Sequence, residues 1–438
     1  MKPYTSSLIF ALTTLVLGWG SAPAMAQHEH GGQKPAVVAT AAAASAPASA
    51  VKPARKPKPQ LGIGTAFAPD GTLWWVGLNV DNQLVIQSAS LAPTKSTLGV
   101  ATPLSLQWSA PRVIDIGGDP ISADGENHPK LLFGPNNTVM IAYTTPLPKP
   151  NTGYVRMLRS TDGGQTFAQP FTVHADRQEI THRFESIGFD AKGLLHAIWI
   201  DKRDLEAAPK VGNKSSYRGA AIYRASSTDG GATFGPDTKV ADHSCECCRI
   251  ALAQGTDGVL NAMWRHVYEP DVRDHAFAAL DSAAAPVTTV RATFDEWHVN
   301  GCPHHGPGLA AAADGGFHTV WFGIRQSDGA AASGVRYARL KLDGSPDAQT
   351  VRRLPDDRAE HASIMAHGLR VAVVWRSSDG MVSTLKAWLS TDGGKTFTER
   401  RLAQVQGDND FARPVQHGAR MAVVWRNPKE VQVYELVF

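Results

Sequence analysis

One pattern recurs seven times in this chain and limits the folds open to it. In each copy a short apolar segment leads to a turn and a second apolar segment follows, which often ends at Trp. Several turns carry Asp-Gly, as at Asp70-Gly71 and Asp257-Gly258, and Asp-Gly between alternating apolar segments is a strong hairpin signal. Repetition of one supersecondary unit predicts a repeat architecture in which neighbouring units bury each other. The copies cover residues 64–80, 128–144, 183–200, 249–264, 308–322, 362–375 and 412–425.

A second hairpin signal follows the first in three of the copies. It is an eight-residue segment, Ser-Thr-Asp-Gly-Gly-x-Thr-Phe, at residues 160–167, 227–234 and 390–397. The Asp carboxylate can accept backbone N–H groups within the turn, the glycines allow positive φ, and the Phe can pack between strands. The segment resembles the Asp-box, or BNR, repeat of the sialidase superfamily. The resemblance implies a β-propeller in which these turns lie away from the centre and serve folding.

Two hairpins per repeat give a four-stranded blade. We therefore predict an all-β fold, a seven-bladed β-propeller of four-stranded antiparallel blades over residues 61–438. A six-bladed, sialidase-type propeller is the alternative, if the first and last repeats merge. The last repeat, 411–438, holds only about three strands, and we expect it to take a fourth from near Gln60.

The N-terminal 60 residues have a different composition. Lys2, the apolar segment 8–17 and Ala24-Met25-Ala26 are typical of a secretory signal peptide over residues 1–26. Residues 27–60 are rich in Ala, Pro and Lys, which predicts a disordered linker. The apolar segment is too short for a membrane anchor. We therefore expect an exported protein, periplasmic or secreted, with no membrane span after signal cleavage.

Charge is nearly balanced, with 43 basic and 40 acidic residues among 438. This balance, with no basic stripe interleaved with aromatic residues, argues against a nucleic-acid partner. The partners left open are a metal ion, a periplasmic protein and a glycan. The charged segment 201–204 is interpreted as a solvated loop at a blade edge.

Potential metal ligands gather at equivalent positions in the repeats. In a propeller, the loops that lead into the innermost strands open onto one face around the axis, so residues just before each repeat converge. All four cysteines and several histidines fall there. Cys thiolate with His imidazole suits copper or zinc rather than magnesium or calcium, so we predict a copper (or zinc) site. Its candidate ligands are His128, His182, Cys245, Cys247, Cys248, Cys302, His304, His305 and His361.

Disulfide bonding is the main alternative for the cysteines. Three of the four lie within residues 245–248, so only one of them can bridge to Cys302. The other two would then pair across a small, strained ring. A metal site, a strained disulfide and free thiols all remain open at this point. His196, His318 and His417 lie within or next to strand segments and are interpreted as structural.

The resemblance to sialidases also implies an enzyme class to be considered. Sialidases clamp a substrate carboxylate with three arginines, and guanidinium binds carboxylate in a bidentate manner. Arg183, Arg249 and Arg413 follow blade entrances and could form such a clamp. The first repeat, however, has no arginine at 62–67, and no Tyr lies beside a Glu at a late entrance. Whether the chain is an enzyme is left undetermined: we expect metal binding, metal handling or a redox step, with an exo-sialidase-type glycoside hydrolase and a non-catalytic protein- or glycan-binding scaffold as alternatives.

Overall fold

The computed structural model describes residues 60–91, 103–212, 214–281 and 287–438. They belong to one compact unit, built almost entirely of antiparallel sheets. The predicted signal peptide and, except for Gln60, the predicted linker lie outside the described residues. No helix in the described ranges combines the length and the apolar character that crossing a bilayer requires.

Six sheets of four strands and one sheet of three follow one another along the chain. Within each sheet the strands pair in sequence order, from an inner strand outwards. The inner strands are β1 (Gly64–Phe67), β5 (Lys130–Phe133), β9 (His182–Phe189), β15 (Ala251–Gln254), β19 (Gly308–Ala311), β23 (Ala359–His367) and β27 (Arg413–His417). The second strands are β2 (Thr72–Leu78), β6 (Val139–Pro146), β10 (Leu195–Asp201), β16 (Leu260–Arg265), β20 (Phe317–Ile324), β24 (Arg370–Ser378) and β28 (Arg420–Arg426).

The outer half of each sheet is more variable in length. The third strands are β3 (Leu84–Ser90), β7 (Gly153–Ser160), β13 (Ala220–Ser227), β17 (His275–Ala279), β21 (Ser333–Leu340), β25 (Val382–Ser390) and β29 (Val431–Glu435). The fourth strands are β4 (Arg112–Val113), β8 (Phe171–Thr172), β14 (Thr238–Ser244), β18 (Thr289–Arg291), β22 (Pro346–Arg353) and β26 (Thr398–Gln406). A two-stranded insertion, β11 (Lys210–Val211) and β12 (Lys214–Ser215), lies between β10 and β13 together with the short helix α1 (Arg203–Ala207), and a 3₁₀ segment covers Gln326–Ala331.

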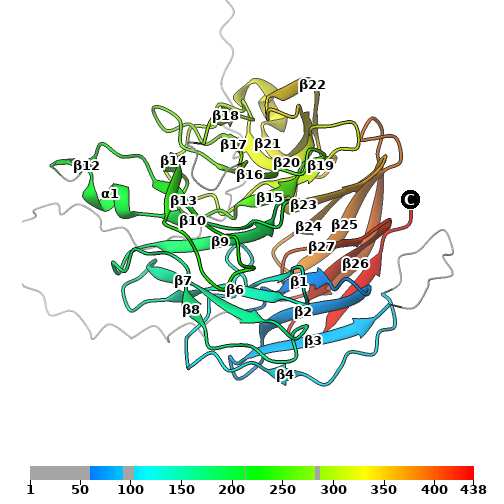
Figure 1. The fold of residues 1–438 in the computed structure, drawn as a ribbon. Helices are drawn as coiled ribbons and strands as arrows, with labels where there is room; N and C mark the ends of the chain where they lie inside the picture. The colour runs from blue at the N-terminus through cyan, green and yellow to red at the C-terminus, as the bar shows by residue number, and fades with distance from the viewer. Residues whose placement is uncertain (1–59, 92–102, 213, 282–286) are drawn as a thin grey trace, which may run out of the picture. The chain divides into compact units, whose positions relative to one another are not determined.

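The sheets close into a ring. Each inner strand contacts the inner strand of the next sheet, and β27 contacts β1. Figure 1 shows this closure, where the red strands of the last sheet lie beside the blue strands of the first. The predicted seven-bladed β-propeller is therefore confirmed, and the six-bladed alternative is wrong.

The core is divided into seven apolar layers, one between each pair of neighbouring blades. Val76 and Leu84 of the first blade, for example, pack with Ile141 of the second, and Val424 of the last packs with Leu73 of the first. Each sheet is therefore apolar on both faces. This arrangement explains why the second strands are almost completely buried and carry near-continuous apolar runs.

The predicted turns form as expected. Gly71 and Gly258 have φ of 83° and 81° in the hairpins that join first and second strands. The three eight-residue segments form identical turns after β7, β13 and β25. In each, the first Ser accepts the N–H of the second Gly, and the Asp accepts the N–H of the second Thr. Because each of these turns follows a third strand, it lies at the end of the blade opposite to the loop that precedes the inner strand.

Two expectations are corrected. From Gln60 onwards, where the description of the chain begins, no strand of the N-terminal segment joins the last blade, and the Gln60 side chain instead accepts the N–H of Ala123. Its outer edge is contacted by another segment of the first blade, where Leu104 N donates to Val433 O at 2.7 Å. The segment 201–204 is not a solvated loop, because Asp201 is completely buried and accepts hydrogen bonds from the Trp199 indole and the Arg203 guanidinium.

Candidate metal site

The four cysteines lie in two loops that lead into neighbouring blades. Cys245, Cys247 and Cys248 lie between β14 and β15, and Cys302 lies between β18 and β19. Both loops precede an inner strand, so both open at the same end of the propeller. The structure therefore brings Cys302 to the other three across a separation of more than fifty residues, as the repeat pattern predicts.

The sulfur atoms are spaced as a thiolate metal site requires. The Sγ atoms of Cys245, Cys247 and Cys302 all lie within 4.8 Å of one another, and Cys245 and Cys247 are 3.8 Å apart. The Cys248 sulfur is 3.9 Å from each of those two. All four cysteines are free, since a disulfide needs about 2.05 Å. A metal bound about 2.3 Å from each thiolate separates its sulfur ligands by roughly 3.8 to 4.0 Å, so little movement is needed to hold one.

Burial divides the cluster into an inner and an outer part. Cys245, Cys247 and Cys248 are buried in the layer between the third and fourth blades, whereas Cys302 is exposed. Hydrogen bonds from the other three thiols hold the pKa of Cys245 well below its usual range. The contact with Cys245 raises the pKa of Cys302 to about 12. Cys245 is therefore the thiol of the cluster that loses its proton most readily, and thiols that bind a metal would release their protons.

Two arginines lie beside the sulfurs and were not found by reasoning from the sequence. The Arg273 guanidinium helps to lower the pKa of Cys245. Arg265 accepts the N–H of Cys245 on its carbonyl at 2.9 Å and donates from its guanidinium to the carbonyls of Arg273 and His305. A signal for Arg265 exists in the sequence, because Arg directly follows the repeated Trp at the end of three second strands, as in Trp264-Arg265.

Two of the candidate histidines lie next to the cysteine loops. The His305 ring stacks on the His361 ring with centroids 4.4 Å apart. His361 Nδ1 is 3.2 Å from a carboxylate oxygen of Glu126, and its ring stacks on Phe411 at 3.5 Å. Burial lowers the pKa of both imidazoles, so both are neutral. Neither belongs to the group of ligand atoms that the three sulfurs form.

The other candidate histidines are held by different neighbours. His128 Nε2 is 3.2 Å from the Arg413 guanidinium. His182 stacks on His174 with centroids 4.0 Å apart. His304 is exposed and lies two residues after Cys302. The structure thus gathers the four cysteines but distributes the candidate histidines around the same end of the propeller.

The candidate arginines are mostly engaged with carboxylates of the protein itself. An Arg249 Nη atom is 2.5 Å from Glu126, and an Arg413 Nη atom is 2.6 Å from Asp410. Arg183 is partly exposed, and burial lowers the pKa of its guanidinium. Two of the three arginines therefore lack the unpaired guanidinium N–H groups that would bind a substrate carboxylate in a bidentate manner.

Backbone strain is concentrated at this end of the propeller. Apart from glycine and asparagine, five of the described residues have positive φ: Phe184, His243, Glu296, His304 and His361. Four of them lie near the beginning of an inner strand or in the loop before it, and His243 lies at the end of the fourth strand β14, directly before the loop that carries Cys245. Positive φ is costly for such side chains and persists where surrounding structure imposes it, often at functional sites. This strain singles out the end that carries the cysteines.

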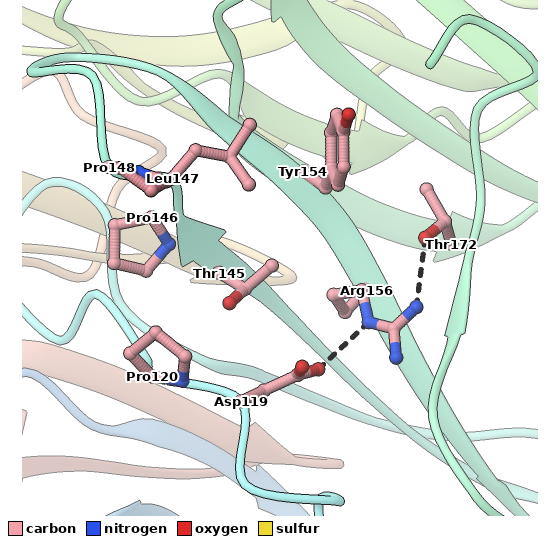
Figure 2. A pocket seen from close by; sticks show the side chains of 9 residues that line it. All are labelled: Asp119, Pro120, Thr145, Pro146, Leu147, Pro148, Tyr154, Arg156 and Thr172. Atoms are coloured by element: carbon pink, nitrogen blue, oxygen red, sulfur yellow. Dashed lines mark hydrogen bonds and ion pairs between the residues drawn. The ribbon is translucent and has the colours of Figure 1, made fainter. Parts of the chain in front are cut away.

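A separate cleft of about 720 Å³ lies on the second blade. Figure 2 shows the ion pair between Asp119 and Arg156 on one side of it, with Nε and Oδ2 2.8 Å apart, and the Tyr154 ring on another. Thr172 also binds the Arg156 guanidinium. No cysteine lines this cleft, so it is distinct from the sulfur cluster.

Neither a family model nor a curated protein matches the sequence. The fold is similar to that of a family 25 polysaccharide lyase, an ulvan lyase (TM-score 0.50, 14% identity, 86% of this chain and 94% of that chain). Other similar structures are a Hadza microbial sialidase (0.45, 14%, 77% and 73%) and the intramolecular trans-sialidase of Ruminococcus gnavus (0.47, 11%, 74% and 96%). The fold is therefore that of a β-propeller similar to the ulvan lyase, and no family is assigned to the chain. Likeness at this identity concerns the fold alone, so the chemistry must be argued from this chain's own residues.

Proposed function

We propose that this protein is an exported sialidase-like propeller that binds a transition metal, copper rather than zinc, through Cys245, Cys247 and Cys302. Its role would be metal handling or a redox step. The observation that carries the proposal is the convergence of these three sulfurs from two loops at metal-ligand spacing. Four cysteines occur in the whole chain, and all four lie in this one cluster.

The ligand set favours copper. Thiolates are soft ligands and select Cu(I) or Zn(II) over hard cations. A structural zinc ion takes four ligands in a tetrahedron, whereas the ligand atoms that all lie within 4.8 Å of one another are three sulfurs and no histidine nitrogen. In this proposal the cysteines are the ligands, and the nearby histidines line the surrounding loops. The exposure of Cys302 provides a side from which an ion can enter.

Export belongs to the same proposal. It rests on the signal-peptide pattern of residues 1–26 and the linker composition of residues 27–60. The three identical turns are proposed to be Asp-boxes, because their sequence and their hydrogen bonds agree. A periplasmic or secreted location would place the thiols in an oxidising compartment, where a bound metal would protect them from disulfide formation.

The glycosidase alternative has less support. Its clamp needs free guanidinium groups, but Arg249 and Arg413 already bind carboxylates. Binding of a glycan without chemistry is supported by the cleft on the second blade, whose lining includes the Tyr154 ring and the Asp119 carboxylate, which are groups that bind sugars. We keep that as the second candidate function.

Metal titration tests the proposal. Reduced protein is titrated with Cu(I) or Zn(II) against a competing chelator, and X-ray absorption counts the sulfur atoms bound to the metal. We expect one Cu(I) held by three sulfurs. We also expect a loss of affinity of at least about a hundredfold in Cys247→Ser and in Cys302→Ser, because each removes a ligand.

Cys248→Ser then decides between three and four sulfur ligands. We expect three, so this variant should bind copper more tightly than either ligand variant. A loss equal to that of Cys247→Ser would mean a four-thiolate site, for which zinc is the better ion. If the wild-type protein binds neither ion stoichiometrically, the proposal is wrong.

A further inference from the structure

The two cysteine loops are joined by a carboxylate from the loop that leads into the second blade. One oxygen of Glu126, Oε2, accepts the backbone N–H of Arg249 at 2.9 Å and that of Gly306 at 3.0 Å. Arg249 directly follows Cys248, and Gly306 lies four residues after Cys302. A single oxygen atom thus fixes the distance between the loop that carries three sulfurs and the loop that carries the fourth.

We propose that Glu126 is the positioning residue of the thiolate site, acting through the backbone of both cysteine loops. This inference rests on the proposed metal binding. A metal held by Cys302 and by Cys245 or Cys247 bridges two loops that no covalent bond fixes to each other. The metal affinity therefore depends on how well the two loops are held at the correct separation before binding. Less free energy is then spent on ordering the ligands when the metal binds.

The Glu126 side chain is itself rigidly held. It is 3% exposed, and its other oxygen, Oε1, pairs with the Arg249 guanidinium at 2.5 Å and accepts from His361 Nδ1 at 3.2 Å. Burial opposes its ionisation, but Arg249 and His361 outweigh burial and hold the pKa of Glu126 below its usual range. Asp124 fixes the backbone before it by accepting the N–H of Glu126 at 2.9 Å. Glu126 is therefore a fixed, ionised acceptor rather than a mobile side chain.

The loops are in close contact where Glu126 binds them. A Cβ atom added at Gly306 would lie 2.7 Å from the Arg249 carbonyl oxygen, so only glycine permits this approach. The Arg265 guanidinium makes a second connection by donating to the carbonyl of His305, while its carbonyl accepts the Cys245 N–H. Because this second connection remains, loss of Glu126 should loosen the register of the loops without separating them.

Copper binding by Glu126 variants tests the role. Glu126→Gln keeps the shape and one oxygen acceptor but removes the charge, and Glu126→Ala removes every contact. We expect Cu(I) affinity to fall severalfold in Glu126→Gln and by about ten- to a hundredfold in Glu126→Ala, which is the usual range for groups that orient metal ligands. X-ray absorption should show two sulfurs on copper in Glu126→Ala, because Cys302 is lost first.

The matched control is Asp410→Ala. Asp410 is also buried and pairs with an arginine, Arg413, at 2.6 Å, but its carboxylate accepts hydrogen bonds from Ile63 and Arg413 rather than from the cysteine loops. It should keep wild-type copper affinity and three sulfurs. A folded Glu126 variant with wild-type affinity and three sulfurs would overturn the inference, and Glu126→Gln decides the matter if Glu126→Ala does not fold.

A metal-free measurement separates this inference from the proposed function. Diamide oxidises two thiols to a disulfide and is itself reduced to a hydrazine. The rate at which Cys302 forms a disulfide with the 245–248 loop in the apo protein reports how often the two loops lie in register. We expect this rate to fall severalfold in the Glu126 variants and to stay unchanged in Asp410→Ala. Failure of the wild-type protein to bind copper would sink the proposed function, whereas unchanged disulfide formation in the Glu126 variants would sink this inference.

Discussion

At the scale of single residues, buried histidines determine how the stability of the folded protein responds to acid. His318 is 1% exposed and Nδ1 lies 2.8 Å from the Tyr337 hydroxyl, which donates to it. Burial lowers the pKa of His318 to about 4, and that of His196 to about 4 as well. The strand pattern already marked both as structural. The structure adds the physical result, which is that both imidazoles are neutral in the folded protein.

Acid should therefore destabilise the protein through these histidines. An unfolded histidine titrates near 6.5, so between pH 6.5 and 4 the unfolded chain binds more protons than the folded one. Stability is fully present above pH 6.5 and falls towards pH 4, by up to about 1.4 kcal/mol per pH unit for each such residue. His318→Asn should flatten the slope of unfolding free energy against pH by that amount, measured with urea at pH 6.5, 5.5 and 4.5. An unchanged slope would contradict the assignment, and His417→Asn, at an exposed site, is the control.

At the scale of elements, three turns repeat the same chemistry in three blades. Asp229 accepts the N–H groups of Ala232 and Thr233 at 3.0 and 2.9 Å and the Thr233 hydroxyl at 2.6 Å. Ser227 accepts the N–H of Gly231. All partners lie within five residues, so the turn forms from local sequence, which is why the pattern could be recognised without the structure.

Removing one of these carboxylates should lower the stability of the protein and leave its metal content unchanged. Asp229→Ala leaves two backbone N–H groups without their acceptor. The turn is exposed, so water replaces part of the loss and the cost should be about 1 kcal/mol, measured by urea unfolding. Metal content should not change, because the turn lies at the end of the propeller opposite to the cysteine loops. Lost metal with unchanged stability would show that the turn has another role.

Elements that depend on distant partners were harder to predict. Asp70-Gly71 and Asp257-Gly258 specify their hairpins locally, and the sequence is enough to find them. The outer edge of β29 is completed through Leu104, whose partner Val433 lies 329 residues away, and no local pattern indicates that pairing. Asp201 was wrongly expected to be solvated for a different reason: its hydrogen-bond partners Trp199 and Arg203 are only two residues away, but its burial depends on the packing of the whole blade, which a run of charged residues does not reveal.

At the scale of the whole molecule, closure of the seven blades into a ring brings the cysteine loops together at one end of the propeller. Equivalent positions before the inner strands allowed the convergence of Cys302 with Cys245 and Cys247 to be predicted from the repeat pattern. The pairing of Arg249 with Glu126 could not be predicted, because it joins the entrances of two non-adjacent blades across the axis. Which side chain reaches which across a ring depends on rotamers and packing, and sequence spacing does not contain that information.

This pairing across the axis leads to an expectation about activity. With Arg249 and Arg413 already bound to carboxylates, the protein should not cleave sialosides. A fluorogenic sialoside incubated with the purified protein should give no turnover above a buffer blank. Turnover that disappears in Arg249→Ala would instead assign the protein to the glycosidases.

The contact between the first and last blades, which closes the ring, has a consequence for folding. Every other pair of neighbouring blades is connected by a loop, whereas the first and last blades meet through non-covalent contacts, which include the Leu104–Val433 hydrogen bond and the apolar layer that contains Ile63, Leu73 and Val424. These contacts have the largest sequence separation in the molecule, so their loop-closure entropy is the greatest and they should form late. A nascent chain that lacks its last blade would leave Ile63 and Leu73 facing water. Such a chain is an aggregation-prone intermediate until the last repeat, residues 411–438, arrives and closes the ring.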